Sequence, residues 1–73
     1  MTSLALQLGR RALRLRRQRR KSQAEIANLA GISVAFLSMI ERGRRLPHLG
    51  TASKLAAALG VTLSQLFRFD ARD

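Results

Sequence analysis

Cysteine, tryptophan and tyrosine are absent from this chain of 73 residues, which has one histidine and four acidic side chains. Without cysteine the chain forms no disulfide and no thiolate metal site, as suits a reducing cytoplasm. The histidine has no second ligand nearby, and the carboxylates form no acid–base couple. No apolar run approaches the roughly 18 residues that span a membrane. The sequence therefore predicts a cytoplasmic protein that is not an enzyme, takes no cofactor or metal and crosses no membrane.

Basic side chains outnumber acidic ones by fourteen to four, which gives a formal net charge of +10. The excess is concentrated near the N-terminus, because positions 10–21 carry eight basic residues and no acidic one. Such a charge favours a polyanion as the partner. Three phenylalanines are the only aromatic residues, which is little for the base stacking that RNA recognition uses. We therefore expect double-stranded DNA as the partner, with RNA as the weaker alternative.

The arginine-rich first segment also resembles an organelle transit peptide or a cationic helix on a membrane surface. Both interpretations are disfavoured, because a small bundle needs this segment to complete its core. The segment supplies one apolar stripe at helical spacing, formed by Leu4, Leu8, Ala12 and Leu15. Leu6 and Leu13 point away from this stripe, either as scattered surface leucines or as part of a contact with a partner.

Apolar periodicity, caps and glycines predict a single domain, 1–73, that contains five helices, no strand and no long linker. The expected boundaries are about Leu4–Arg19, a helix-turn-helix at 22–42, Leu49–Leu59 and Leu63–Phe67, followed by a frayed tail at 68–73. The expected N-caps are Ser22, Ser33 and Thr62. A chain of this length buries only a small core, which favours self-association.

The most informative segment is 22–42, where two short helices are joined by one glycine. Gly31 supplies the left-handed turn, and Ala27 is small enough to let two steeply crossing helices approach each other. Apolar residues keep one helical register through both halves, namely Ile26, Ala30, Ile32, Leu37 and Ile40. The pattern predicts a helix-turn-helix whose second helix enters a DNA groove.

With these residues the chain resembles the phage-repressor-like helix-turn-helix regulators of the Cro/repressor, or Xre, type. The resemblance runs without a gap from about residue 8 to residue 67. Its matching strings are Leu8-Gly9-Arg10-Arg11, Leu15-Arg16, Ser22-Gln23-Ala24-Glu25-Ile26-Ala27, Ala30-Gly31-Ile32-Ser33, Leu37-Ser38-Met39-Ile40-Glu41-Arg42-Gly43, Pro47, Leu55-Ala56-Ala57-Ala58-Leu59-Gly60-Val61 and Leu66-Phe67. It implies an all-α, compact five-helix bundle of the lambda-repressor-like type, with a recognition helix in the major groove.

The first turns of the recognition helix are expected to contact base edges. The residues concerned are Ser33, Val34, Ala35, Ser38 and Met39. Gln, Asn and Arg are common on this face in the resembling family, whereas the apolar side chains here contact only thymine methyls. We therefore expect recognition of the DNA sequence to depend on DNA shape or on Arg44 and Arg45. Phe36 belongs either to the core, which we favour, or to a wedge against the sugar-phosphate chain.

Phosphate contacts are expected at both ends of the motif. The candidates are Gln23, Lys21, Arg20, Arg42, Arg44 and Arg45. Gln23 opens the first helix of the motif, where its amide and the backbone N–H groups meet a phosphate, as the matching glutamine does in the family. The alternative is a helix-opening glutamine without a ligand. Arginines after the recognition helix also interact favourably with its dipole.

The resemblance further implies a partly buried salt bridge between Arg16 and Glu41, which sets helix packing. The chain departs from the family at Arg20 and Lys21, where relatives have glycine followed by an apolar residue. We therefore expect Arg20 in a left-handed conformation, at a cost of about 1 kcal/mol, and the loss of one core contact at Lys21.

Excess apolar surface near the C-terminus predicts a homodimer. The expected interface is Leu49, Leu63, Phe67 and Phe69, with helix-1 leucines Leu6 and Leu13 as the next candidates. Alternatively, the two phenylalanines fold back onto their own bundle.

The predicted function is a transcriptional regulator that binds a two-fold-related operator. The alternative is an antitoxin that binds a toxin partner and its own promoter.

Overall fold

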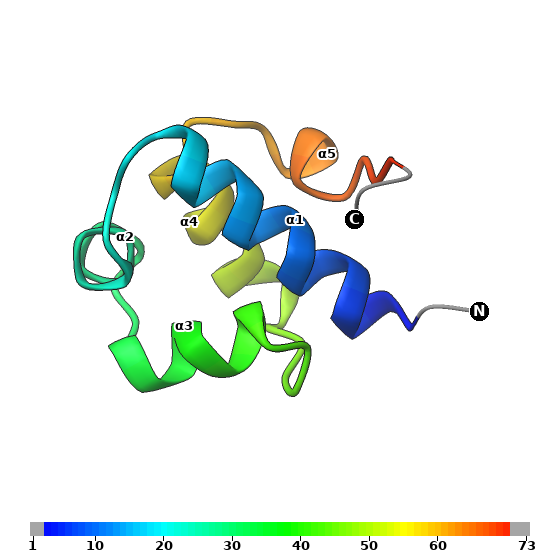
Figure 1. Ribbon diagram of the computed structural model, residues 1–73, viewed down its shortest axis with the longest axis horizontal. Coiled ribbons are helices and arrows are strands. Elements are labelled where there is room, and N and C mark those ends of the chain that lie inside the picture. Colours follow the sequence, from blue (N-terminus) through cyan, green and yellow to red (C-terminus); the bar gives the residue numbers. More distant parts are fainter. Residues whose placement is uncertain (1–2, 71–73) are drawn as a thin grey trace.

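The computed structural model describes residues 3–70, which form five helices and, within that range, no strand. The helices are α1 (Leu4–Gln18), α2 (Gln23–Ala30), α3 (Val34–Glu41), α4 (Leu49–Ala58) and α5 (Leu63–Leu66). In Figure 1, α1 runs along the molecule with α2 at its C-terminal end, α3 on one side and α5 on the other. This confirms the all-α, five-helix fold, with helix ends within one residue of those predicted. Of the expected frayed tail, 68–70 lies outside any helix, and 71–73 lies outside the described residues.

Side-chain caps define where the helices begin. The hydroxyls of Ser22, Ser33 and Thr62 each accept a hydrogen bond from the backbone N–H three residues later, so these three predicted caps are confirmed. The sequence analysis did not predict the cap of α4, in which the backbone N–H of Thr51 donates to Nδ1 of His48 at 3.3 Å. The single histidine therefore has a structural role.

At the start of α2, the side chains of Ser22 and Glu25 each accept a hydrogen bond from the other residue's backbone N–H. This capping box predicts how the stability of the chain depends on pH. The backbone N–H of Ser22 donates to Glu25 Oε1 at 3.0 Å, and this bond is the main reason that the pKa of Glu25 is lowered. Because the folded-state pKa is depressed, the carboxylate stabilises the fold above its ordinary pKa, and this contribution is lost as the pH falls through the depressed value. As the pH is lowered, the melting temperature of the Glu25→Gln variant should therefore fall less than that of the unmodified chain. If the melting temperatures of the two proteins fell equally with pH, the cap would not be linked to protonation of Glu25.

The core lies between α1, α2, α3 and α4 and is closed by α5. Its largest fully buried side chains are Leu8, Ile26, Leu37, Ile40, Leu55, Leu59 and Leu66. Leu4 was expected on the same stripe as Leu8, but it is 48% exposed. That expectation was wrong because the first turn of α1 projects beyond the other helices (Figure 1).

Gly9 lets α1 approach α3 more closely than any side chain would allow. A Cβ atom placed on Gly9 would overlap the carbonyl oxygen of Ile40 and lie 2.8 Å from that of Glu41. Both obstacles are backbone atoms, which cannot rotate away. This close crossing fixes the end of α3 against the middle of α1.

No single helix in residues 3–70 is long and apolar enough to cross a membrane, although α2 and α3 together match such a span in length and composition, with a bend of 108°.

Candidate nucleic-acid interface

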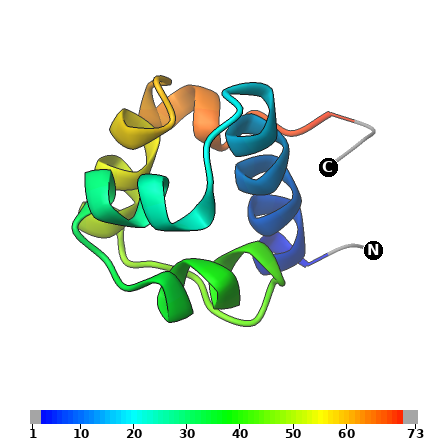
Figure 2. The same cartoon turned by 60° about the vertical axis from the view of Figure 1, so that its left-hand side comes forward.

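The pair α2 and α3 has the geometry of a helix-turn-helix. Gly31 has a φ of +70°, and the backbone N–H of Ile32 donates to the Ala27 carbonyl at 3.0 Å, so the chain turns at once. Between the two helices the chain bends by 108°, within the range of about 90–120° that is typical of the motif. Figure 2 shows α3 along one edge of the molecule, below α2.

The expected base-contacting residues differ in exposure. Ser33 and Ala35 are exposed, Val34 is 44% exposed, and Ser38 and Met39 are half-buried. The Ser33 hydroxyl accepts a hydrogen bond from the N–H of the third residue beyond it, so it is already used as a cap. The free surface of α3 is therefore small and mostly apolar.

Phe36 is half-buried and packs against the core, in agreement with the favoured alternative for this residue. The guanidinium of Arg45 lies 5.5 Å from the centroid of its ring, which is within the range of a cation–π interaction. This contact holds Arg45 beside α3.

A buried network connects α1, α2 and α3. Arg16 Nε donates to Glu41 Oε2 at 2.7 Å, and Arg16 Nη2 donates to Glu41 Oε1 at 3.0 Å. Glu41 is only 8% exposed, and its hydrogen bonds raise the pKa of Arg16. Arg16 Nη1 also donates to the Lys21 carbonyl at 2.9 Å. The pair that the resemblance implied is thus present, and it also holds the turn between α1 and α2.

Gln23 joins this network in a way that the sequence analysis missed. Its Nε2 donates to Glu41 Oε1 at 2.8 Å, so the amide nitrogen points inward at the end of α3. The spacing of Gln23 from Glu41 offered no signal for this contact, because the two residues meet only through the helix crossing. The second hydrogen of Nε2 and the backbone N–H groups of the first turn of α2 are the donors that this position offers to a phosphate, because the amide oxygen only accepts hydrogen bonds.

The turn before α2 has the strain that the sequence analysis predicted. Arg20 has a φ of +55° and is the one described residue other than glycine with a positive φ. Arg20 and Lys21 are both exposed, and Lys21 Nζ lies 3.8 Å from Glu25 Oε2. An exposed pair at this distance contributes little to stability.

Replacing Arg20 by glycine is expected to raise the free energy of unfolding by roughly 0.5 kcal/mol. Relief of about 1 kcal/mol of left-handed strain should outweigh the greater entropy of glycine in the unfolded chain. Arg17→Gly is the matched control, because Arg17 is also exposed but has a helical conformation within α1, where glycine should lower the free energy of unfolding by about 1 kcal/mol. Thermal melting measures both, and a destabilised Arg20→Gly variant would contradict the prediction.

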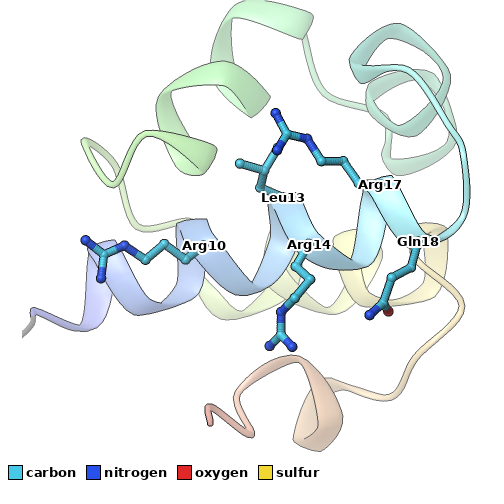
Figure 3. Close-up of a pocket in the computed structure, with 5 residues that line it drawn as sticks. All are labelled: Arg10, Leu13, Arg14, Arg17 and Gln18. Carbon is cyan, nitrogen blue, oxygen red and sulfur yellow. The ribbon is translucent and has the colours of Figure 1, made fainter. Parts of the chain in front are cut away.

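The basic residues of positions 10–21 do not all face one side of the molecule, although they are close together in the sequence. Arg11 donates to the Gln65 carbonyl at 2.9 Å, and Arg19 donates to the Gly60 carbonyl at 3.1 Å. Arg14 lies 3.3 Å from Asp70, and Figure 3 shows it directed toward the C-terminal segment. These side chains fasten α1 to the C-terminal third. The position of Arg11 and Arg14 beside the buried stripe of α1 indicates their side of the helix, but not their partners in the C-terminal third.

Five other cations lie where α2 begins and α3 ends, which the Gln23–Glu41 contact brings together. Arg20 and Lys21 lie before α2, and exposed Arg42, Arg44 and Arg45 follow α3. Arg42 Nε donates to the Ser38 carbonyl at 3.3 Å, so its side chain lies along its own helix. We call these five residues, which are the cationic candidates for phosphate contact, the phosphate cluster.

The residues expected at a dimer interface are only partly brought together. The rings of Phe67 and Phe69 meet edge to face at 6.1 Å, and both pack against the core. Leu63 is half-buried at the start of α5. Leu49 is 68% exposed, but it opens α4 and so lies a helix length away from α5. The aromatic pair thus follows the fold-back alternative, and of the four expected residues only Leu49 is largely exposed.

Within residues 3–70 no group of three histidine, cysteine, aspartate or glutamate side chains is placed to hold a metal ion.

Comparisons with known proteins agree with this geometry. The model of a family described as helix-turn-helix matches residues 11–66. The uncharacterized HTH-type transcriptional regulator y4dJ of Sinorhizobium fredii is 42% identical over 59 residues, which are 81% of this chain and 77% of that protein. The immunity repressor protein of Bacillus phage phi105 is 36% identical over 81% of this chain, but over only 41% of its own length.

Among solved structures, the restriction-modification controller protein C.AhdI from Aeromonas hydrophila is similar, with a TM-score of 0.82 and 32% sequence identity. The match covers 85% of this chain and 94% of the controller. All three are named for regulation, as a transcriptional regulator, a repressor and a controller protein.

Proposed function

Since this chain belongs to the helix-turn-helix family of DNA-binding transcriptional regulators, we propose that it binds a two-fold-related operator as a homodimer, with α3 in the major groove. It acts in the bacterial cytoplasm, on the DNA of the nucleoid. One observation carries the proposal: a helix-turn-helix bend of 108° stands beside a cluster of five exposed cations. Of the two acidic residues near that cluster, Glu41 is buried against Arg16, and Glu25 is exposed 3.8 Å from Lys21.

The phosphate cluster positions the protein, and the first turn of α3 reads the bases. Val34 and Ala35 are exposed and reach thymine methyls, while Ser38 offers the hydroxyl. Only one polar side chain on this face is free for base edges, so DNA shape supplies part of the specificity. Arg44 and Arg45 follow α3 and provide the charge that senses a narrow groove.

A two-fold axis near α5 would set two copies of α3 about 34 Å apart, in successive major grooves. Leu49 is exposed at the start of α4, and Leu63 is half-buried at the start of α5. Phe67 and Phe69 support the interface from beneath, because their rings pack on the core.

The test is selection of binding sites from a random duplex library, followed by sedimentation of the chain alone and with the selected duplex. The expected result is a two-fold-related consensus bound by two chains, with half-site centres about 10 base pairs apart. Leu63→Ser should lose cooperative binding while weak non-specific affinity remains. A chain that stays monomeric on a single asymmetric site would overturn the homodimer.

Control of a restriction-modification system is a second candidate, because the match to the controller from Aeromonas hydrophila extends over 94% of that chain. A selected consensus that recurs upstream of an adjacent restriction endonuclease gene would support it, and its absence there would exclude it. A toxin partner is not proposed, because none of the relatives described above is named as an antitoxin.

A further inference from the structure

The outer face of α1 carries a shallow groove that the DNA interface does not use. Its volume is about 490 Å3, and its lining is Arg10, Leu13, Arg14, Arg17 and Gln18. Figure 3 shows Leu13 and Arg17 directed to the same side of α1, Arg10 extended along the helix, and Arg14 turned toward the C-terminal segment. The groove thus combines one apolar side chain with three guanidinium groups.

The groove faces neither the core nor the exposed turns of α3. Leu13 and Arg17 lie about 140° and 180° around the helix from buried Leu8. The side of α1 that meets α3 is marked instead by Gly9 and Arg16. A partner seated in the groove therefore need not displace α3 from DNA.

The chemistry of the lining favours carboxylates combined with an apolar group. Among residues 3–70 no acidic side chain lines the groove, yet the carboxylate of Asp70 already lies 3.3 Å from Arg14 at its edge. Arginine pairs well with carboxylate and with phosphate. A nucleic-acid backbone, however, would leave the half-buried Leu13 without an apolar contact.

We propose that the outer face of α1 is a docking surface for an acidic segment of a second protein, which places one apolar side chain against Leu13 and carboxylates on Arg10 and Arg17. Leu13, which a DNA-binding role leaves unexplained, then has a function. This surface goes beyond the proposed operator binding and does not depend on it.

The test uses a capped peptide of alternating glutamate and alanine with one central leucine, and the same peptide with serine in place of that leucine. NMR spectra of the full chain are followed at about 150 mM salt, where non-specific charge attraction is screened within about 8 Å. The leucine peptide is expected to shift the signals of residues 10–18 and to bind roughly fivefold or more tightly than the serine peptide, because part of the leucine is buried.

Three variants make the test specific. Leu13→Ser should abolish the preference for leucine, and the exposed pair Arg10→Gln with Arg17→Gln should weaken both peptides without unfolding the chain. Leu29→Ser is the matched control, because Leu29 is 64% exposed beside Lys21 and should not matter. The preference of the Leu29→Ser variant should equal that of the unmodified chain.

Each other outcome overturns the docking surface. Equal affinity for the two peptides, absence of binding, or shifts spread over Lys21 and Arg44 would show that only net charge attracts the peptide. Displacement of the peptide by duplex DNA, with shifts at Leu13, would assign this face to nucleic acid. Operator binding is scored separately on DNA alone, so failure of either proposal leaves the other testable.

Discussion

Raising the salt concentration from about 50 to about 200 mM is expected to weaken the binding of duplex DNA roughly a thousandfold or more. The phosphate cluster contributes up to five cations per chain, and a dimer would therefore neutralise about six to ten phosphates. Each neutralised phosphate releases condensed counterions, so the affinity falls steeply with salt. Fluorescence anisotropy across a salt series measures the slope, and a nearly flat titration would contradict the account.

Two arginine variants test whether the position of the charge decides the salt dependence of DNA binding. Arg44→Gln removes a member of the phosphate cluster and should reduce the salt slope by about one for each chain. Arg19→Gln removes a side chain that is bonded to the Gly60 carbonyl, so the slope should not change. Equal changes for both variants would mean that net charge, and not position, decides DNA binding.

Replacing Arg16 or Glu41 by alanine is expected to lower the free energy of unfolding by about 3 kcal/mol, because either change strands a buried charge. The side chains of Arg16 and Glu41 are only 13% and 4% exposed. Loss of Arg16 also frees the Lys21 carbonyl, and loss of Glu41 leaves the amide of Gln23 without its acceptor. Thermal and denaturant unfolding measure the effect.

The double variant should be less destabilised than the sum of the single ones, with a coupling of about 2 kcal/mol. Lys21→Ala is the control, because its pair with Glu25 is exposed and should contribute little to stability. Strict additivity of Arg16→Ala and Glu41→Ala would show that the two residues do not interact.

The helices and the pair Arg16–Glu41 could be anticipated from sequence, but for different reasons. Helix ends depend on local chemistry, such as the hydroxyl of Ser33 and the left-handed turn at Gly31, and these signals survive without knowledge of the fold. The ion pair joins residues far apart in sequence, so only a family resemblance could indicate it.

The distribution of the arginines could not be anticipated, because it depends on what lies opposite each face of α1. Arg11 and Arg19 reach backbone carbonyls of the C-terminal third, whereas Arg20 points to solvent. The prediction for Leu4 was wrong for the same reason, since periodicity indicates which face of a helix is buried but not how far the neighbouring helices extend. The inward amide of Gln23 likewise depends on the crossing of α2 and α3.

The central claim is that α3 reads bases, and one comparison tests it most directly. Site selection from a random duplex library is carried out with the unmodified chain and with Ala35→Asn, a change at an exposed position that introduces a side chain able to pair with adenine. The account predicts that the consensus changes at the same position in both half-sites and is unchanged elsewhere. An identical consensus bound with uniformly altered affinity would show that α3 does not read bases.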